Sequence, residues 1–102
     1  MKKFVNDPKS FVPEMLEGIA LANPDTLRYV PEYNLIMRAD APREDKVSIV
    51  QGSGSGHEPA HVMVVGRGML DAACPGNVFA PRRWTTCWRP ASCSTLPRAC
   101  CT

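Results

Sequence analysis

The sequence lacks the features that mark membrane, secreted or polyanion-binding proteins. No unbroken run of apolar residues exceeds four, as at positions 62–65, whereas a bilayer-spanning helix needs about twenty. Lys and Arg number 12 against 10 Asp and Glu, an excess too small to indicate a nucleic-acid or membrane partner. Polar residues follow the basic start where the apolar part of a signal peptide would run, so we expect a cytoplasmic protein.

Acidic residues are missing from the last third of the chain. Residues 1–80 carry eight Lys and Arg against ten Asp and Glu, and no acid follows Asp71. Residues 81–102 hold four Arg, both Trp and four of the five Cys, without a C-x-x-C pair that would indicate zinc. We therefore expect 1–80 to form the folded part and 81–102 to be a disordered tail. Its composition is typical of GC-rich DNA read out of frame, which suggests a frameshift.

Apolar spacing predicts one helix and several strands. Asp7-Pro8 is a favourable helix start, apolar residues recur at 12, 15, 16 and 19, and Asn23-Pro24 supplies the stop. Two short apolar or aromatic runs, 27–30 and 34–37, suit edge strands or a strand preceded by an extended loop. The run 47–51 is predicted to be a buried strand.

The most informative stretch follows that strand and alternates glycine with serine. Gly52, Gly54 and Gly56 precede His57-Glu58-Pro59, and the apolar segment 60–65 is predicted to be helical. Alternate positions without a side chain let the backbone approach a ligand, and amides at a helix start can donate to its oxygens. Strand, glycine loop and helix together predict a receptor for a small polar molecule.

Two known motifs fit this stretch poorly. A dinucleotide G-x-G-x-x-G would need glycine where His57 stands, and a Walker A loop needs a Lys, none of which follows Lys46. His57 to His61 matches the H-E-x-x-H zinc-hydrolase motif, but Pro59 is tolerated only in a first helical turn and no third ligand follows. We therefore predict no metal site. His57 either exchanges a proton with a substrate hydroxyl or merely caps the helix, and spacing alone leaves both open.

The order of these segments resembles the N-terminal part of dihydroxyacetone kinases and of their substrate-binding K subunit, over residues 1–80. The segments that carry the resemblance are 1–8, 38–42, 47–50, the glycine run with His-Glu-Pro at 52–59, 66–70, and the Ala-Cys-Pro-Gly segment within 72–79. The resemblance implies an α/β fold, the N-terminal part of a Rossmann-like domain with a central sheet. It also implies phosphorylation of short ketoses such as dihydroxyacetone at a terminal hydroxyl.

Site roles follow from the same resemblance. The backbone of Gly54, Ser55 and Gly56 is expected to contact the ketose, and His57 to accept a proton from its hydroxyl or to bind it. Ser53 stands where the family usually has glycine. The phosphate donor is ATP with Mg²⁺ on a separate helical domain, or a phosphotransferase phosphocarrier acting through nucleotide on an ADP- or ATP-binding L subunit, so no cofactor is expected in this chain.

The resemblance ends at Ala80, before the Lys, Asp and His that the family would bring to the ketose later. We therefore expect a truncated kinase part that is inactive alone and would belong to a homodimer when intact. The main alternative is a non-catalytic module that binds a small polyol. A zinc hydrolase is a weaker alternative.

Overall fold

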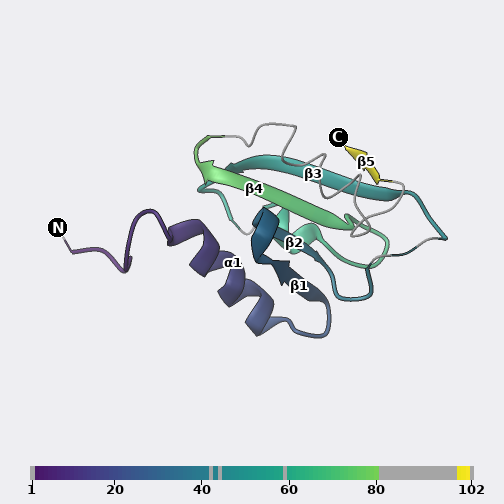
Figure 1. Cartoon of the computed structure of the whole chain (residues 1–102), viewed down its shortest axis with the longest axis horizontal. Helices are drawn as coiled ribbons and strands as arrows, with labels where there is room; N and C mark the ends of the chain where they lie inside the picture. Colours follow the sequence, from purple (N-terminus) through teal and green to yellow (C-terminus); the bar gives the residue numbers. More distant parts are fainter. Residues whose placement is uncertain (1, 42, 44, 59, 81–98, 102) are drawn as a thin grey trace.

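The computed structural model describes residues 2–41, 43, 45–58, 60–80 and 99–101. Its elements in chain order are helix α1 (Phe11–Ala22), strands β1 (Leu27–Val30) and β2 (Leu35–Arg38), strand β3 (Ser48–Ser55), strand β4 (Ala72–Val78), strand β5 (Ala99–Cys101), and two short 3-10 helices, η1 (Pro31–Tyr33) and η2 (Val62–Val64). The strands form one sheet in the order β1-β2-β4-β3-β5, with α1 lying along it (Figure 1). The predicted α/β class is confirmed.

Helix α1 begins later than the sequence pattern predicts. The Asp7 carboxylate accepts the amide of Lys9 (3.1 Å) and its carbonyl accepts the amide of Ser10 (3.0 Å), so Asp7-Pro8 forms a turn ahead of the helix. The predicted end is confirmed. The helix ends at Ala22, where the Asn23 side chain donates to the carbonyl of Ile19 (3.0 Å) and satisfies a group that the helix end leaves open.

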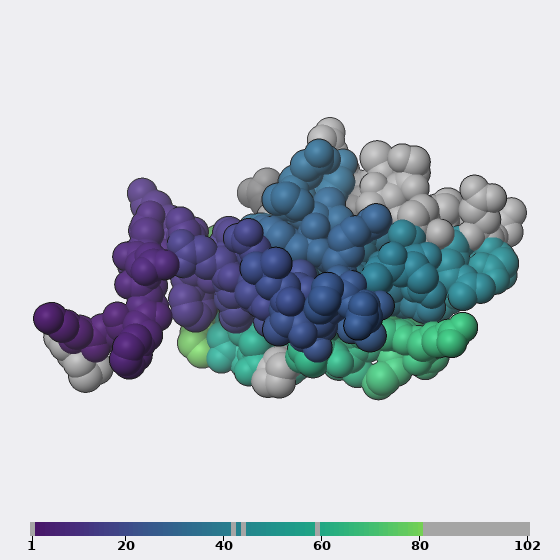
Figure 2. All heavy atoms as spheres, turned by 90° about the horizontal axis from the view of Figure 1, so that it is seen from below, coloured from purple at the N-terminus to yellow at the C-terminus, as the bar shows by residue number. Residues whose placement is uncertain are grey.

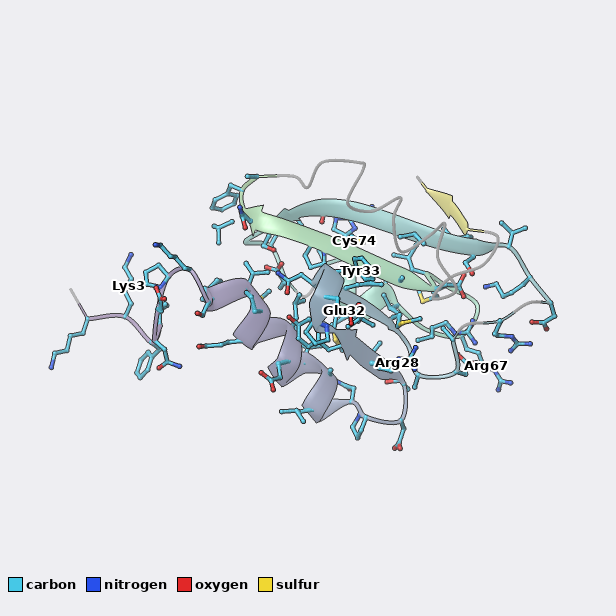
Figure 3. The ribbon with its side chains drawn as sticks, viewed as in Figure 1. Lys3, Arg28, Glu32, Tyr33, Arg67 and Cys74 are labelled. Atoms are coloured by element: carbon cyan, nitrogen blue, oxygen red, sulfur yellow. The ribbon has the colours of Figure 1, made fainter. Side chains whose placement is uncertain are left out.

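The sheet separates two apolar clusters, because successive residues of a strand point to opposite faces. The cluster on the α1 side contains Val12 and Leu16 of the predicted helix stripe, with Leu27, Ile36, Val62, Val65 and Ala73. The cluster on the other face contains Leu35, Met37, Ala41, Val50, Ala72 and Cys74, with Tyr33 packed against it (Figure 3). Cys74 is fully buried, as expected for a small apolar side chain.

Strands β1 and β2 form an antiparallel hairpin that joins the rest of the sheet through β2. Leu27 pairs with Arg38 at one end and Val30 with Leu35 at the other, and Asn34 takes the left-handed conformation (φ 47°) in the connection. Of the two predicted edge strands, β1 lies at an edge of the described sheet, whereas β2 lies between β1 and β4. β1 coincides with the predicted run 27–30, and β2 begins and ends one residue later than the predicted run 34–37.

Strands β3 and β4 are parallel, and β5 runs parallel to β3 on its other side. The predicted strand 47–51 is confirmed as the first part of β3, but it is buried on one face only: Val50 is fully buried and Ile49 is 42% exposed. The disorder expected for 81–102 concerns residues that, apart from 99–101, lie outside the described part of the chain.

The N-terminal segment stands away from the sheet and helix (Figure 2). Phe4 is fully exposed there, and Lys3 extends from the same segment (Figure 3). Within the described residues, no helix is long and apolar enough to cross a bilayer.

Candidate functional site

The predicted site lies at the carboxyl ends of the parallel strands β3 and β4. The glycine run does not form the predicted loop: Gly52 and Ser53 pair with Cys74 and Pro75, and β3 continues to Ser55. Glycine has a low strand propensity, but pairing with a buried neighbouring strand overrides it. The pairing register shifts between Ser53 and Ser55, so the irregularity falls inside the run that sequence analysis singled out.

Gly54 is needed because another part of the chain passes close to it. A Cβ at this position would stand 3.1 Å from the backbone nitrogen of Ala80 and 3.3 Å from the carbonyl carbon of Phe79. The close backbone approach predicted for a ligand is therefore made by the segment that leaves β4. A side chain at position 54 would push that segment away from β3.

Gly56 makes the turn that ends β3, with φ +117°, a conformation that side chains disfavour. Its amide donates to the Glu58 carboxylate (2.8 Å), and the carbonyl of Ser55 just before it accepts the amide of Phe79 (2.7 Å). The Gly56 amide, which the resemblance assigns to the ketose, is thus bonded to Glu58 in this structure.

Ser55 is buried and its hydroxyl is already used. Its Oγ donates to the carbonyl of Gly76 in β4 (2.8 Å), and the side chain is fully inaccessible. The hydroxyl of Ser55 is therefore not available to a ligand, and its carbonyl accepts the Phe79 amide (2.7 Å). The hydroxyl instead joins the ends of β3 and β4.

His57 is exposed on the turn and His61 lies beside it. Their ring centroids are 5.3 Å apart, with an angle of 74° between the ring planes. The α-helix predicted for 60–65 is wrong: His61 has φ 63° and precedes the 3-10 helix η2, which covers only Val62–Val64. β-Branched valines and an early Gly66 make a stable α-helix of this length unfavourable. As a result, the segment after His57 has neither the amide donors of an α-helix start nor the helical spacing of the zinc motif.

The described residues contain no group of three or more His, Cys, Asp and Glu side chains that could hold a metal ion. The two imidazoles lack a third protein ligand within that part of the chain, and the Glu58 carboxylate is bonded to the Gly56 amide. A zinc site of the hydrolase type needs three protein ligands and an open position. The geometry at His57 and His61 does not fit it.

Sequence analysis missed an ion cluster around Asp71, at the opposite end of β3. The buried Asp71 carboxylate accepts bonds from Lys46 Nζ (2.8 Å to each oxygen), Arg38 Nη1 (3.2 Å) and the amide of Ile49 (2.8 Å). Arg38, also buried, binds Asp40 through two nitrogens at 2.8 and 2.6 Å. The sequence feature that could have indicated this cluster is Asp71 itself, a single acid between the apolar residues Leu70 and Ala72.

The cluster keeps its acids ionised. Burial opposes ionisation of Asp71, but the Lys46 ammonium, the Ile49 amide and the Arg38 charge outweigh it, and the pKa of Asp71 is lowered. The hydrogen bond from Arg38 is the main reason that the pKa of Asp40 is lowered. Asp71 also bonds through its backbone to Arg38 of β2 (3.0 Å) and Ile49 of β3 (2.9 Å), so it fixes these strands relative to each other.

A profile of the Dak1 domain matches residues 17–87 of this chain, well over half of its length. The chain belongs to the Dak1 domain family. Its relatives include the dihydroxyacetone-binding subunit DhaK of the PEP-dependent dihydroxyacetone kinase of Escherichia coli, 49% identical over 80 residues, which are 78% of this chain and 22% of that subunit. The resemblance drawn from the sequence motifs is confirmed.

Two further comparisons extend the family likeness. The DhaKLM operon coactivator DhaQ of Lactococcus lactis is 48% identical over 79 residues, which cover 78% of this chain and 24% of that protein. The crystal structure of the dihydroxyacetone kinase from C. freundii in complex with AMP-PNP and Mg²⁺ superposes with a TM-score of 0.81 at 32% identity, over 93% of this chain and 18% of that one. The chain thus spans less than a quarter of the length of these Dak1 relatives.

Proposed function

We propose that this Dak1 chain binds a short ketose such as dihydroxyacetone at the turn after β3. The name of its E. coli relative states that DhaK is a dihydroxyacetone-binding subunit, and the two chains are 49% identical over 80 residues. The positions proposed to contact the ketose are the backbone of Gly54, Ser55 and Gly56, with His57 beside them. Phosphorylation of the ketose at a terminal hydroxyl would be the activity of the larger assembly.

The observation that carries the proposal is where the turn lies. Ligands of open α/β sheets bind outside the carboxyl ends of parallel strands, where backbone groups are no longer used in strand pairing. The parallel strands β3 and β4 end together at Ser55 and Val78. The exposed imidazole of His57 follows that end directly, on a turn whose Gly56 carries no side chain.

The proposed chemistry assigns each group one task. His57 accepts the proton of the ketose hydroxyl while that oxygen attacks the phosphorus of the donor. The bond between phosphorus and the rest of the donor breaks, and the rest of the donor leaves with the bonding electrons. A general base must lie within hydrogen-bond reach of the proton it takes. A ketose oxygen that accepts the Gly56 amide replaces the Glu58 carboxylate, which now holds it at 2.8 Å. Glu58 therefore keeps the turn formed in the absence of substrate.

The phosphate donor is proposed to reside on a partner. AMP-PNP and Mg²⁺ are present in the C. freundii structure, and the E. coli relative is named PEP-dependent. Either ATP on a separate domain or a phosphocarrier acting through an L subunit would supply the phosphoryl group, and a homodimer is the proposed state of the intact assembly.

Ligand-detected NMR of the full chain with dihydroxyacetone tests the proposal. Saturation transfer to the ketose is expected for the unmodified chain, and His57→Ala should weaken binding about tenfold, the loss expected for one hydrogen bond. His61→Ala is the matched control, because this imidazole stands 5.3 Å away but is not assigned to the ketose. If His57→Ala and His61→Ala bind dihydroxyacetone equally well, His57 is not part of the site. If the unmodified chain shows no saturation transfer to the ketose, the proposed function is rejected.

A second candidate is a non-catalytic ketose-binding module, and the likeness to DhaQ favours it. That relative is named a coactivator of an operon and is 48% identical over 79 residues. Adding a nucleotide-binding partner subunit and a phosphate donor separates the two functions. Ketose binding with product formation supports the kinase, whereas binding without turnover supports the module.

A further inference from the structure

Phe79 is an exposed aromatic residue that holds an unfavourable backbone conformation. It follows β4 directly, is 81% exposed, and has φ 52°, in the left-handed region that bulky residues avoid. Such a conformation costs about 1 kcal/mol or more and persists only where the surroundings impose it. Because the ring is mostly exposed, its burial does not offset the cost of this backbone conformation. Another contact must therefore hold Phe79 in it.

The ring lies against the turn that carries His57. A Cβ built on Gly56 would be 3.1 Å from both Cε1 and Cζ of Phe79, so the ring covers the space where a side chain of residue 56 would stand. The Phe79 amide donates to the carbonyl of Ser55 (2.7 Å), which fixes the backbone of Phe79 to the end of β3. The backbone of Phe79 is thus bonded to the end of β3, and its ring lies beside Gly56 at the proposed ketose site.

We propose that Phe79 forms the apolar wall of the ketose site and limits the length of the ketose that fits. This inference rests on the proposed function. A short ketose has polar oxygens for the backbone and His57, and C–H groups that need an apolar surface. The exposed Phe79 ring beside Gly56 supplies that surface. Because the ring also restricts the space next to Gly56, a three-carbon ketose is favoured over a four-carbon one.

Phe79 variants of the full chain test the wall. Phe79→Ala should weaken dihydroxyacetone binding about tenfold, the fold-change that about 1.4 kcal/mol of aromatic contact represents. It should also lower the ratio of the affinity for dihydroxyacetone to the affinity for the four-carbon ketose erythrulose. Phe4→Ala is the matched control, because Phe4 is fully exposed on the N-terminal segment, and it should leave both affinities unchanged.

A second measurement separates contact from structural support. The ketose C–H protons should shift upfield on binding, through the ring current of Phe79, and show NOEs to its ring protons. Phe79→Leu keeps an apolar side chain and should abolish the ring-current shift while retaining part of the affinity. It also provides the decisive comparison if Phe79→Ala loses the dispersed amide spectrum of a folded chain.

The outcomes distinguish this inference from the proposed function. If the unmodified chain binds dihydroxyacetone and both Phe79 variants bind it equally well with unchanged ketose shifts, the wall is rejected and the proposed function stands. If the unmodified chain binds no ketose, the proposed function fails and the wall falls with it. Weaker binding in the variants with loss of the ring-current shift supports the wall.

Discussion

Replacing Asp71 by Asn tests whether the ion cluster holds the sheet that carries the site. The Asp71 carboxylate is almost fully buried and accepts hydrogen bonds from Lys46, Arg38 and the amide of Ile49. Asn can still accept one bond, but it leaves two cations without a buried counter-charge. The variant changes no residue at the Gly56 turn, so it separates stability from ligand contact.

The loss of unfolding free energy in Asp71→Asn depends on how exposed Lys46 and Arg38 are. Removing one member of a buried ion pair costs about 3–5 kcal/mol. Lys46 is 32% exposed and can turn toward water, and Arg38 keeps its two bonds to Asp40, so the lower end of that range applies. We therefore expect Asp71→Asn to lower the free energy of unfolding by about 3 kcal/mol, which shifts a urea midpoint by about 2–3 M for a chain of this size.

The same variant has a distinct pH signature. Because the pKa of Asp71 is lowered in the folded chain, its carboxylate stabilises the fold above its unfolded-state pKa of about 3.9. That contribution is lost as the pH falls through the lower, folded-state pKa. Urea unfolding followed by circular dichroism between pH 7 and pH 2 should show a smaller acid-induced loss for Asp71→Asn than for the unmodified chain.

Two further variants provide a control and a milder change to the same cluster. Asp45→Asn removes an exposed acid that pairs with Arg43, and its urea midpoint should match that of the unmodified chain. If Asp71→Asn does not fold, Lys46→Met should cost about 1 kcal/mol, because Arg38 and Ile49 still bind the carboxylate. A midpoint for Asp71→Asn within the error of the unmodified chain would show that the cluster does not hold the strands together.

Three further predictions concern the site. Gly56→Ala should lower the free energy of unfolding by about 1–2 kcal/mol in urea titrations, because of its positive φ and the nearby Phe79 ring. Gly66→Ala is the control, because a Cβ at position 66 meets no atom within 4 Å, and it should be neutral or slightly stabilising. If the two variants change the free energy of unfolding equally, the turn geometry at Gly56 is contradicted. Equimolar zinc should leave the amide spectrum unchanged; tight binding lost in both His57→Ala and His61→Ala would revive the hydrolase alternative. The chain alone should not phosphorylate dihydroxyacetone in a coupled assay, because the phosphate donor is proposed to reside on a partner. Turnover without a partner would contradict this.

Elements that depend on local pattern could be predicted from the sequence. The spacing of Val12, Leu16 and their neighbours located α1, and short apolar or aromatic runs located β1, β2 and the start of β3. Elements that depend on distant partners could not. The glycine run was predicted to be a loop, yet it pairs with β4 because Cys74 and Pro75 lie beside it.

The site shows the same division between local and distant information. The glycines and His57 were found from the sequence because their spacing is unusual within a short segment. Two neighbouring groups were missed: the Glu58 carboxylate accepts the Gly56 amide, and the Phe79 ring, which follows β4, lies where a side chain of residue 56 would stand. The helix predicted after His57 failed because its valines favour an extended or tightly wound backbone.

A crystal structure of the full chain with dihydroxyacetone tests the central claim most directly. We predict the ketose at the carboxyl ends of β3 and β4, with its oxygens within hydrogen-bond distance of the backbone of Gly54 to Gly56 and of the His57 imidazole. Ketose bound elsewhere on the chain, or a His57 ring that turns away from a ketose at this turn, would contradict the account.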